Sequence, residues 1–392
     1  MPDRIGESAR IVIVGTGIAG ATAALTLRAE GYQGGVVLVG SEHAEPYRRP
    51  PLSKDLLAGR TSTERIRLRS AEAWAVQHID LRSGVTATAL DRARRTVQLS
   101  DRTELGYDRL LLATGGRPRT IEGVPTLRTR EDALALRARL REGGRILIIG
   151  AGLIGLETAA TASAMGCQVT VWEADDRVLG RVVPGELAAP IAALHREHGV
   201  DLRLNTPVRH VTRLPGGGFR AVGDDVQWSG DHVLAAIGIV PETELAAHSG
   251  LPVDDGILVD LCLTTFDPAV YAAGDVARLP AGRREHWSDA QAQGATAARN
   301  MLGRRSPHTA IPWCWSDQYD LKLQICGRLA GEPVVSGDLA GRDASIRFVH
   351  SGDLVGAVCM NRPREHRELR DRIEKTASGA QARTCRAGSG RG

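Results

Sequence analysis

The chain has 392 residues, of which 42% are hydrophobic and 4% aromatic, and its formal net charge is +4. This length suits two or three domains rather than one ordinary core. The mild charge and the lack of a long apolar run argue against a nucleic-acid-binding or membrane-spanning protein. Residues 1–10 are polar and contain no signal-peptide apolar region, so we expect a soluble cytoplasmic protein. The sequence carries no signal for the oligomeric state.

Residues 11–14 form an apolar strand that runs into the glycine-rich turn Gly15-Thr16-Gly17-Ile18-Ala19-Gly20. In such a motif the first glycine allows a tight turn, and the second lets the backbone approach a pyrophosphate. The third glycine lets the helix pack on the strand, so the phosphates meet the helix N-terminus. One match of this kind would be weak evidence.

Residues 36–39 form the second parallel strand that we predict. The following loop, residues 46–54, contains a double proline that cannot continue a helix. Strand-like alternation returns at residues 86–99. Residues 110–115 read as a buried strand ending in the small residues Ala113, Thr114 and Gly115, where a ligand can approach.

A second glycine motif follows another apolar strand, residues 146–149, and contains Gly150, Gly152 and Gly155. Two such motifs at domain spacing imply two dinucleotides. The leading hypothesis is a flavin and a nicotinamide cofactor with a hydride passing between them. In the second unit Glu173 follows the next strand, where a carboxylate accepts hydrogen bonds from the adenosine ribose and repels a 2′-phosphate. NADH should therefore be preferred, although Arg177 and Arg181 lie close enough in sequence to soften this preference.

Residues 233–238 read as a buried strand before Pro241, where we expect the chain to return to the first domain. Residues 270–275 end a strand with an acid, and a helix begins near His286. The predicted fold is α/β, with two Rossmann-like dinucleotide-binding domains and a small C-terminal α+β domain. The predicted boundaries are 1–120 with 240–308 for FAD, 121–239 for NAD, 309–378 for the C-terminal domain, and 379–392 for a disordered tail.

The six cysteines, Cys167, Cys262, Cys314, Cys326, Cys359 and Cys385, show no CxxC and no metal-ligand spacing. Reduced thiols and no metal site are the expectation. The histidines His195, His198 and His210 lie in a polar helix and loop, so we expect them to be solvated rather than ligating.

In order, these segments resemble the single-component FAD-dependent NAD(P)H:ferredoxin reductases that serve bacterial cytochromes P450 and aromatic-ring dioxygenases, a branch of the glutathione-reductase-like flavoproteins. The similarity covers about residues 8–370. Its most specific pieces are PYRRPPLSK (46–54), LLLATGGRPR (110–119), YAAGDVA (271–277) and PWCWSDQYDLKLQICG (312–327).

The resemblance implies FAD and NADH as cofactors, with Lys54 beside the flavin and Glu157 near the nicotinamide, where the two could pair. It implies cofactor-binding roles for Gly15, Gly17, Ala19, Gly20, Ser41, Glu42, Arg49, Lys54, Ala87, Ala113, Thr114, Gly115, Arg128, Gly150, Gly152, Leu153, Ile154, Gly155, Glu173, Arg181, Ile237, Gly238, Gly274, Asp275, His286, Trp287 and Trp315. Asp275 would bind the ribityl chain, and Trp287 would begin a helix whose positive N-terminus faces the flavin ring.

The sequence departs from this family at two places. Gly40 and Ser41 stand where an acid is frequent, so the ribose contact falls to Glu42. Cys314 replaces a usual aromatic residue, and we expect it to be a buried small apolar side chain.

The resemblance implies a ferredoxin-type iron–sulfur partner with an acidic surface, and Arg48, Arg304, Arg305 and Arg328 are candidates to attract it. Disulfide reduction is disfavoured because the helix after the first glycine motif has no cysteine. Two alternatives stay open. One is a direct NADH oxidase or peroxidase, and the other is a redox-responsive binding protein like apoptosis-inducing factor.

Overall fold

The computed structural model describes residues 5–6 and 8–388, with side chains described up to residue 376. It separates into two compact units, each made of three stretches of chain. Unit 1 comprises Met1–Arg48, Glu64–Arg117 and Val240–Ala310, and unit 2 comprises Arg49–Thr63, Pro118–Ile239 and Ile311–Gly392.

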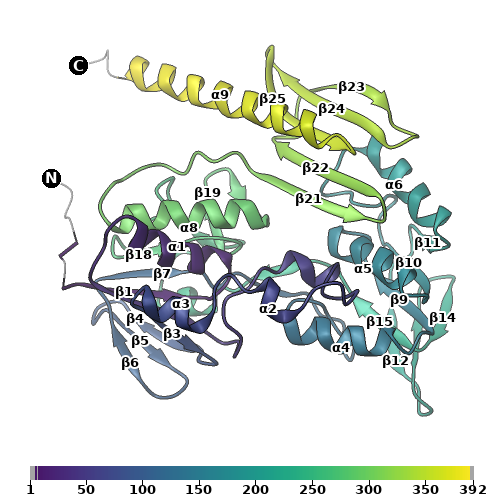
Figure 1. Cartoon of the computed structure of the whole chain (residues 1–392), viewed down its shortest axis with the longest axis horizontal. Coiled ribbons are helices and arrows are strands. Elements are labelled where there is room, and N and C mark those ends of the chain that lie inside the picture. The colour runs from purple at the N-terminus through teal and green to yellow at the C-terminus, as the bar shows by residue number, and fades with distance from the viewer. Residues whose placement is uncertain (1–4, 7, 389–392) are drawn as a thin grey trace. The chain divides into compact units, whose positions relative to one another are not determined.

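Unit 1 is built on a five-stranded parallel sheet in the order β18-β7-β1-β2-β3 (Figure 1). Its strands are β1 (Arg10–Val14), β2 (Gly35–Gly40), β3 (Ile79–Ser83), β7 (Arg109–Leu112) and β18 (Val270–Ala272). Strand β1 is central, and the side chains of Ile11, Val12 and Ile13 are fully buried, as expected for a parallel strand covered on both faces.

Helices α1 (Ile18–Ala29) and α8 (Trp287–Met301) of unit 1 lie side by side. They approach closely at Gly294, where a Cβ would come within 2.1 Å of the Ala19 carbonyl oxygen. Only glycine fits this contact. The other elements of unit 1 are α3 (Ala71–Val76), β4 (Ala87–Asp91), β5 (Thr96–Leu99), β6 (Glu104–Gly106), α7 (Glu244–His248), β17 (Ile257–Leu258), β19 (Ala277–Leu279) and β20 (Gly282–Arg283).

Three short elements span a unit boundary: α2 (Thr63–Ile66), β8 (Gly116–Pro118) and β16 (Ile239–Pro241). The stretch predicted as strand-like over 86–99 is the antiparallel pair β4–β5. It reverses at a turn in which Arg95 has φ +54°.

Unit 2 contains a second parallel sheet in the order β11-β10-β9-β15. Its strands are β9 (Arg145–Ile149), β10 (Gln168–Trp172), β11 (Asp201–Arg203) and β15 (His232–Ala235). The helices of this part are η1 (Pro50–Ser53), α4 (Arg130–Leu140), α5 (Leu153–Ala164) and α6 (Gly185–Glu197), and an antiparallel sheet is formed by β12 (His210–Arg213), β13 (Phe219–Val222) and β14 (Gln227–Gly230).

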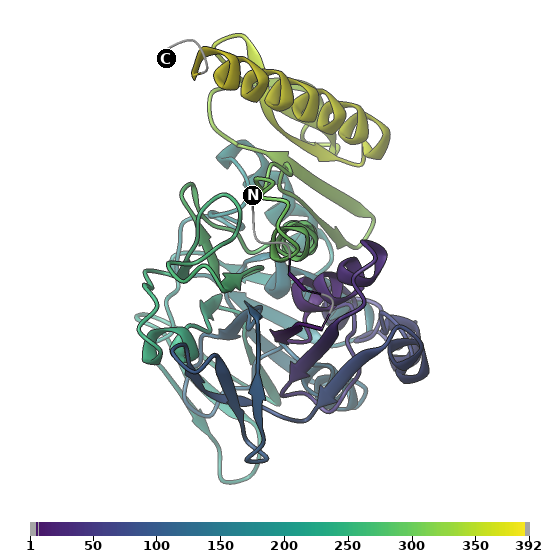
Figure 2. The same cartoon turned by 90° about the vertical axis from the view of Figure 1, so that its left-hand side faces the viewer.

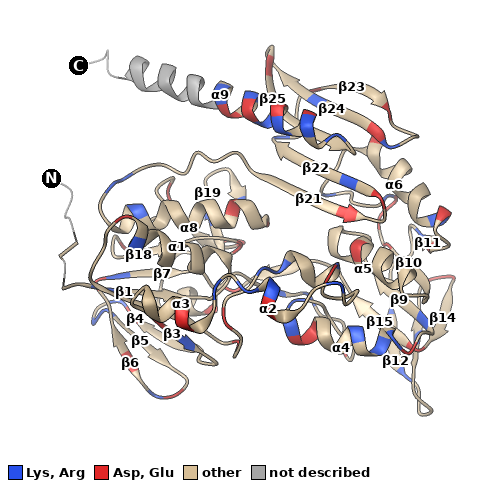
Figure 3. Ribbon diagram, viewed as in Figure 1, with Lys and Arg blue, Asp and Glu red and all other residues tan. Residues whose placement is uncertain are grey.

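The C-terminal part of unit 2 is a five-stranded antiparallel sheet in the order β21-β22-β25-β24-β23. The strands are β21 (Trp313–Gln318), β22 (Leu321–Gly327), β23 (Glu332–Asp338), β24 (Asp343–His350) and β25 (Asp353–Met360). Helix α9 (Pro363–Gly388) lies along this sheet (Figure 2), where Leu369 and Ile373 pack against Cys326 and Cys359. The described side chains of α9 carry both charge signs (Figure 3).

The predicted tail over 379–392 differs from the structure at residues 379–388, which belong to α9. Alanine, glutamine and arginine in this stretch favour a helix, and their helix propensity outweighs the glycine and serine content that suggested a disordered tail. Residues 389–392 lie outside the described residues. The predicted fold class is confirmed by the two parallel sheets with their glycine turns and by the α+β C-terminal part.

Candidate functional site

The first glycine motif forms an open turn between β1 and α1. Gly15 has φ +117°, and a Cβ on Gly20 would stand 2.0 Å from the Gly15 carbonyl oxygen. Gly17 is the N-cap of α1, makes no side-chain cap, and has nothing within 4 Å of the position a Cβ would take. The N-terminus of α1 therefore has no side-chain cap and has open space beside Gly17, which is the arrangement that binds a pyrophosphate.

The second motif repeats this geometry in unit 2. Gly150 has φ +103°, and a Cβ on Gly155 would stand 2.1 Å from the Gly150 carbonyl oxygen. Gly152 is the uncapped N-cap of α5 and again has nothing within 4 Å of its Cβ position. Both motifs thus fit a dinucleotide for the same physical reason.

Gly274 and Asp275 follow β18 in unit 1, and a buried network holds the Gly274 amide. Gln293 Oε1 accepts a hydrogen bond from the Gly274 amide at 2.8 Å, while Gln293 Nε2 donates to Asp289 Oδ2 at 2.6 Å. His308 Nε2 lies 3.1 Å from Asp289 Oδ1. Sequence reasoning missed Asp289 and Gln293 on α8 and His308 in the loop after it, because a polar residue carries no sign of burial until its packing partner is known.

The charge of Asp289 is favoured by its neighbours. Burial acts to raise the pKa of Asp289, but the hydrogen bond and charge of His308 and the charge of Arg284 outweigh it, so this pKa lies below its ordinary value. Burial lowers the pKa of the neighbouring His286, which is the N-cap of α8. His286 is therefore neutral at pH 7. Trp287 is the first residue of α8, as predicted for the start of that helix.

Glu42, the predicted ribose ligand, follows β2 in unit 1. Its Oε2 accepts a hydrogen bond from the Tyr47 hydroxyl at 2.5 Å. Gly40 precedes it, and a Cβ at this position would meet the Thr16 side chain at 2.3 Å. An acid could not replace Gly40 without moving Thr16, which explains why the carboxylate stands two residues later.

A buried carboxylate, Glu157 of α5, lies at the centre of a polar cluster in unit 2. Lys54 Nζ is 3.1 Å from its Oε1, Ser316 Oγ donates to Oε1 at 2.6 Å, and Ser53 Oγ donates to Oε2 at 2.5 Å. Glu157 is 6% exposed. The expected contact between Lys54 and Glu157 is therefore present.

Two opposing effects act on the charge of Glu157. Burial raises its pKa above the ordinary value, whereas the charge of Lys54 and the hydrogen bonds from Ser316 and Ser53 act to lower it. Burial alone would favour the neutral acid form of Glu157. The Lys54 ammonium and the two serine hydroxyl donors oppose this effect and stabilise the carboxylate.

The cluster continues away from Glu157 through fully buried side chains. Gln318 Nε2 donates to Ser316 Oγ at 3.0 Å, and His195 Nε2 lies 2.9 Å from Gln318 Oε1. His195 was predicted to be solvated, and this is wrong: it is 0% exposed. It lies on the inward face of α6 with Leu187 and Ile191, eight and four residues before it.

Trp315 and Trp313 lie next to this cluster in β21. Their rings stack with 5.3 Å between centroids, and Lys54 Nζ lies 5.6 Å from the centroid of Trp315. Cys314 between them is buried as expected, and burial raises the pKa of its thiol to about 12. This thiol is therefore neutral and unreactive at pH 7.

Glu173 follows β10 beside the second glycine motif. Its Oε2 accepts a hydrogen bond from the Ala151 amide at 2.6 Å, and its Oε1 accepts one from the Asp175 amide at 3.0 Å. Arg181 lies over Gly238, with its guanidinium 3.1 Å from the position of a Cβ there.

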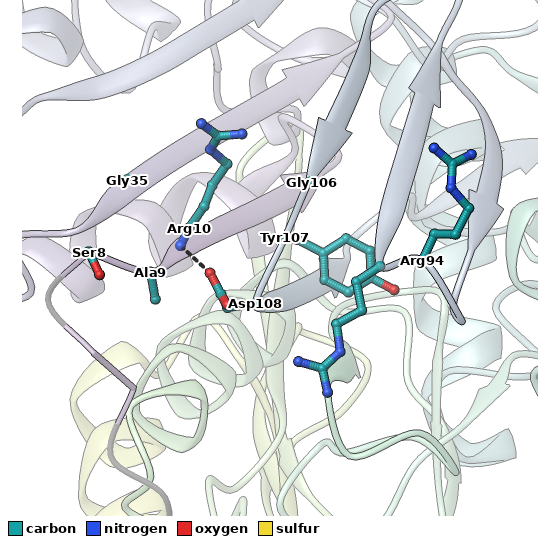
Figure 4. Close-up of a pocket in the computed structure, with 9 residues that line it drawn as sticks. Ser8, Ala9, Arg10, Gly35, Arg94, Gly106, Tyr107 and Asp108 are labelled. Atoms are coloured by element: carbon teal, nitrogen blue, oxygen red, sulfur yellow. Dashed lines mark hydrogen bonds between the residues drawn. The ribbon is translucent and has the colours of Figure 1, made fainter.

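A pocket of about 650 Å³ in unit 1 contains none of the predicted site residues (Figure 4). It is lined by Arg10, Gly35 and Asp108 at the amino ends of β1, β2 and β7, together with Tyr107 and Arg94. Ligands of parallel sheets bind at the carboxyl ends of the strands. This pocket is at the opposite end from Gly15 and is not the nucleotide site.

The predicted residues divide between the units. Unit 1 holds Gly15, Gly17, Ala19, Gly20, Ser41, Glu42, Ala87, Ala113, Thr114, Gly115, Gly274, Asp275, His286 and Trp287, and unit 2 holds Arg49, Lys54, Arg128, Gly150, Gly152, Leu153, Ile154, Gly155, Glu157, Glu173, Arg181, Ile237, Gly238 and Trp315. Within unit 2, Arg49 donates to the Arg128 carbonyl oxygen. No helix in the described chain is long and apolar enough to cross a membrane.

Comparisons with known proteins match most of the chain. Residues 9–294 match the family "Pyridine nucleotide-disulphide oxidoreductase", and residues 313–387 match "Reductase C-terminal". The chain is 38% identical to putidaredoxin reductase of Pseudomonas putida, covering 93% of this chain and 91% of that protein. It is 40% identical to the ferredoxin–NAD(+) reductase component of the anthranilate 1,2-dioxygenase system of Burkholderia cepacia, covering 90% and 91%.

Among solved structures, the chain is similar to the reductase in the covalent putidaredoxin reductase–putidaredoxin complex. The TM-score is 0.88 at 38% identity, and the match covers 93% of each chain.

Proposed function

The chain belongs to the pyridine nucleotide-disulphide oxidoreductase family, and we propose that it is the ferredoxin reductase of an oxygenase system. It is a flavoprotein that uses FAD and NADH. One observation carries the proposal: two glycine turns open onto uncapped helix N-termini, while no cysteine lies along α1 between Ile18 and Ala29. The chain can hold two dinucleotides but has no thiol there to pass electrons to a disulfide.

The residues present fit both groups. Gly15, Gly17 and Gly20 would hold the FAD pyrophosphate, and Asp275 would hold the ribityl chain. Gly150, Gly152 and Gly155 would hold the NADH pyrophosphate, with Glu173 at the adenosine ribose. When bound, FAD takes two electrons as a hydride from NADH and releases them singly, as an iron–sulfur partner requires.

The chain's own groups would orient the two cofactors and stabilise charge at the flavin. The N-terminus of α8, beginning at Trp287, supplies partial positive charge. We assign Lys54 and Glu157 to the hydride-transfer site, where Glu157 holds the lysine ammonium through the 3.1 Å ion pair and the lysine supplies positive charge. Trp315 beside Lys54 supplies an apolar surface that excludes water.

Ferredoxin-coupled electron transfer tests this proposal against its alternatives. The purified protein is mixed with NADH and cytochrome c, with and without an acidic [2Fe–2S] ferredoxin. We expect fast cytochrome c reduction only with the ferredoxin. Equal NADH consumption without ferredoxin, with oxygen or peroxide as acceptor, would support an oxidase or peroxidase. A long-lived complex of reduced flavin and NAD with a change in oligomeric state would support a redox-responsive binding protein.

Cytoplasmic location fits this proposal, because NADH and reduced iron–sulfur partners are found there. The five cysteines whose side chains the structure describes are free, and four of them are buried, which is consistent with a reducing compartment.

A further inference from the structure

When Glu157 is a carboxylate, the hydrogen bonds around Ser316 run in one direction. A Glu157 carboxylate carries no hydrogen, so the single hydroxyl hydrogen of Ser316 must lie in the 2.6 Å contact with Oε1. Ser316 Oγ can then only accept in its 3.0 Å contact with Gln318, which fixes the Gln318 amide with Nε2 toward Ser316.

This orientation continues to the histidine. Gln318 Oε1 faces His195 and can only accept, so His195 Nε2 carries a hydrogen and donates it over 2.9 Å. His195 Nδ1 is buried without a hydrogen-bond partner among the described residues. That suits a neutral ring with an unprotonated Nδ1, and burial lowers the pKa of His195 to about 4.

We propose that Ser316, Gln318 and His195 are positioning residues that keep Glu157 a carboxylate and hold it against Lys54. Every donor in the chain from His195 to Gln318 to Ser316 points toward Glu157, and all three side chains are 0% exposed. Protonating Glu157 at Oε1 would require these hydrogen bonds to reverse and would leave a hydrogen on His195 Nδ1, which has no partner among the described residues, so the network favours the charged form.

Among the described side chains, five titratable groups face the network. Lys54 and Cys314 lie beside Glu157, Asp317 lies 3.5 Å from Lys54, and His198 and Tyr319 lie beside His195. Cys314 is neutral at pH 7, and Asp317, whose side chain is half exposed, contacts Lys54 rather than Glu157. Burial, Lys54 and the hydroxyl donors therefore set the charge of Glu157.

The test is an infrared titration of the FAD-loaded protein, in which the protonated-carboxyl band absent from Glu157→Gln reports Glu157. Ser316→Ala removes a direct donor and should raise the midpoint by about one pH unit, a tenfold change in proton affinity. Gln318→Leu and His195→Leu act through the Ser316 hydroxyl and should each raise it by roughly half a unit. Ser316→Thr should restore it, and the control variants Gln227→Leu and Ser229→Ala should match the parent protein.

A double variant separates positioning from a general loss of packing. Ser316→Ala with Gln318→Leu should titrate like Ser316→Ala alone, since Gln318 acts only through Ser316. A full additional shift in the double variant, or an unchanged midpoint in folded Ser316→Ala, would overturn the proposal.

The inference rests on the proposed function only for its relevance to NADH oxidation, since the infrared midpoint requires neither NADH nor ferredoxin. The acid limb of flavin reduction by NADH should move with the same midpoint in each variant. If the infrared midpoint moves but the acid limb of flavin reduction does not, the three residues position Glu157 as proposed. In that case Glu157 has no role in hydride transfer.

Discussion

Gln293 Oε1 accepts a hydrogen bond from the Gly274 amide at 2.8 Å, and this contact ties helix α8 to the turn that carries Asp275. Asp289 orients the glutamine by accepting from its Nε2 at 2.6 Å. Gln293→Leu should therefore free the turn and raise the dissociation constant for FAD about tenfold, the effect of losing roughly 1.4 kcal/mol of buried hydrogen bonding. FAD release followed by fluorescence measures this, with the exposed Gln291→Leu on the same helix as control. Unchanged release would mean that the turn is held by its own backbone.

Glu157→Ala should slow flavin reduction by NADH about tenfold or more, because Lys54 loses the carboxylate that holds its ammonium. Retention of FAD should change less, since the first glycine motif and Asp275 belong to unit 1. Stopped-flow reduction measures the first and gel filtration the second. The exposed Glu186→Ala on α6 is the control. Unchanged reduction in Glu157→Ala would leave the Lys54–Glu157 pair as a structural contact only.

The Glu173 carboxylate should make NADH the preferred coenzyme. Backbone amides hold both carboxylate oxygens beside the second glycine motif. We expect kcat/KM at least tenfold higher with NADH than with NADPH, and a smaller ratio in Glu173→Ala. Asp176→Ala, which removes an exposed carboxylate three residues along, should leave the ratio as it is. Equal efficiency with both coenzymes in the parent protein would show that Arg177 and Arg181 offset the carboxylate.

His366 should make unit 2 less stable in mild acid. Burial lowers its folded-state pKa from 6.5 to about 4, so between these values the unfolded chain binds a proton that the folded chain does not. Stability is therefore full above pH 6.5 and falls as the pH drops, by about 2 kcal/mol between pH 7.5 and pH 5 from this group alone. Urea unfolding of His366→Gln should show that much less loss. The exposed His350→Gln should keep the parent's pH dependence, and an equal loss in both variants would contradict the assignment.

Arg305 and Arg328 are exposed and form no ion pair with a described carboxylate, whereas Arg304 pairs with Glu30. Changing both free arginines to Glu should slow ferredoxin-coupled cytochrome c reduction several-fold at low salt and leave NADH-to-ferricyanide activity intact, since only the first requires docking of an acidic partner. The difference should shrink as salt screens charges beyond roughly 8 Å. Arg213→Glu with Arg220→Glu makes the same change of charge on β12 and β13 and should have no effect. No slowing in the first variant would place docking elsewhere.

The sequence predicted those parts of the molecule that follow from local patterns. Both glycine turns, the strands that precede them and the start of α8 at Trp287 are where the residues indicated. Lys54 and Glu157 were chosen through family resemblance, and the structure adds their contact.

The polar networks could not be predicted in the same way. Ser53 and Glu157 are 104 positions apart, and His195 and Gln318 are 123 apart. Local periodicity cannot pair such residues. The burial of His195 did leave a signal, because Leu187, Ile191 and His195 share one face of α6, and this spacing could have placed the histidine inside.

The division of each unit into three stretches also sets an order of events during synthesis. Strand β7 has β1 on one side and β18 on the other, but β18 begins only at Val270. While the ribosome makes the stretch from 118 to 269, the edge of β7 that later pairs with β18 has no neighbouring strand. Helix α1 also lacks its packing partner α8 during this interval. An open parallel edge is a site for wrong pairing. The nascent chain is thus most exposed to aggregation before the last third of the protein leaves the ribosome. A chaperone that binds it in this interval protects unit 1, whose sheet combines strands from residues 10–112 with β18 at residues 270–272.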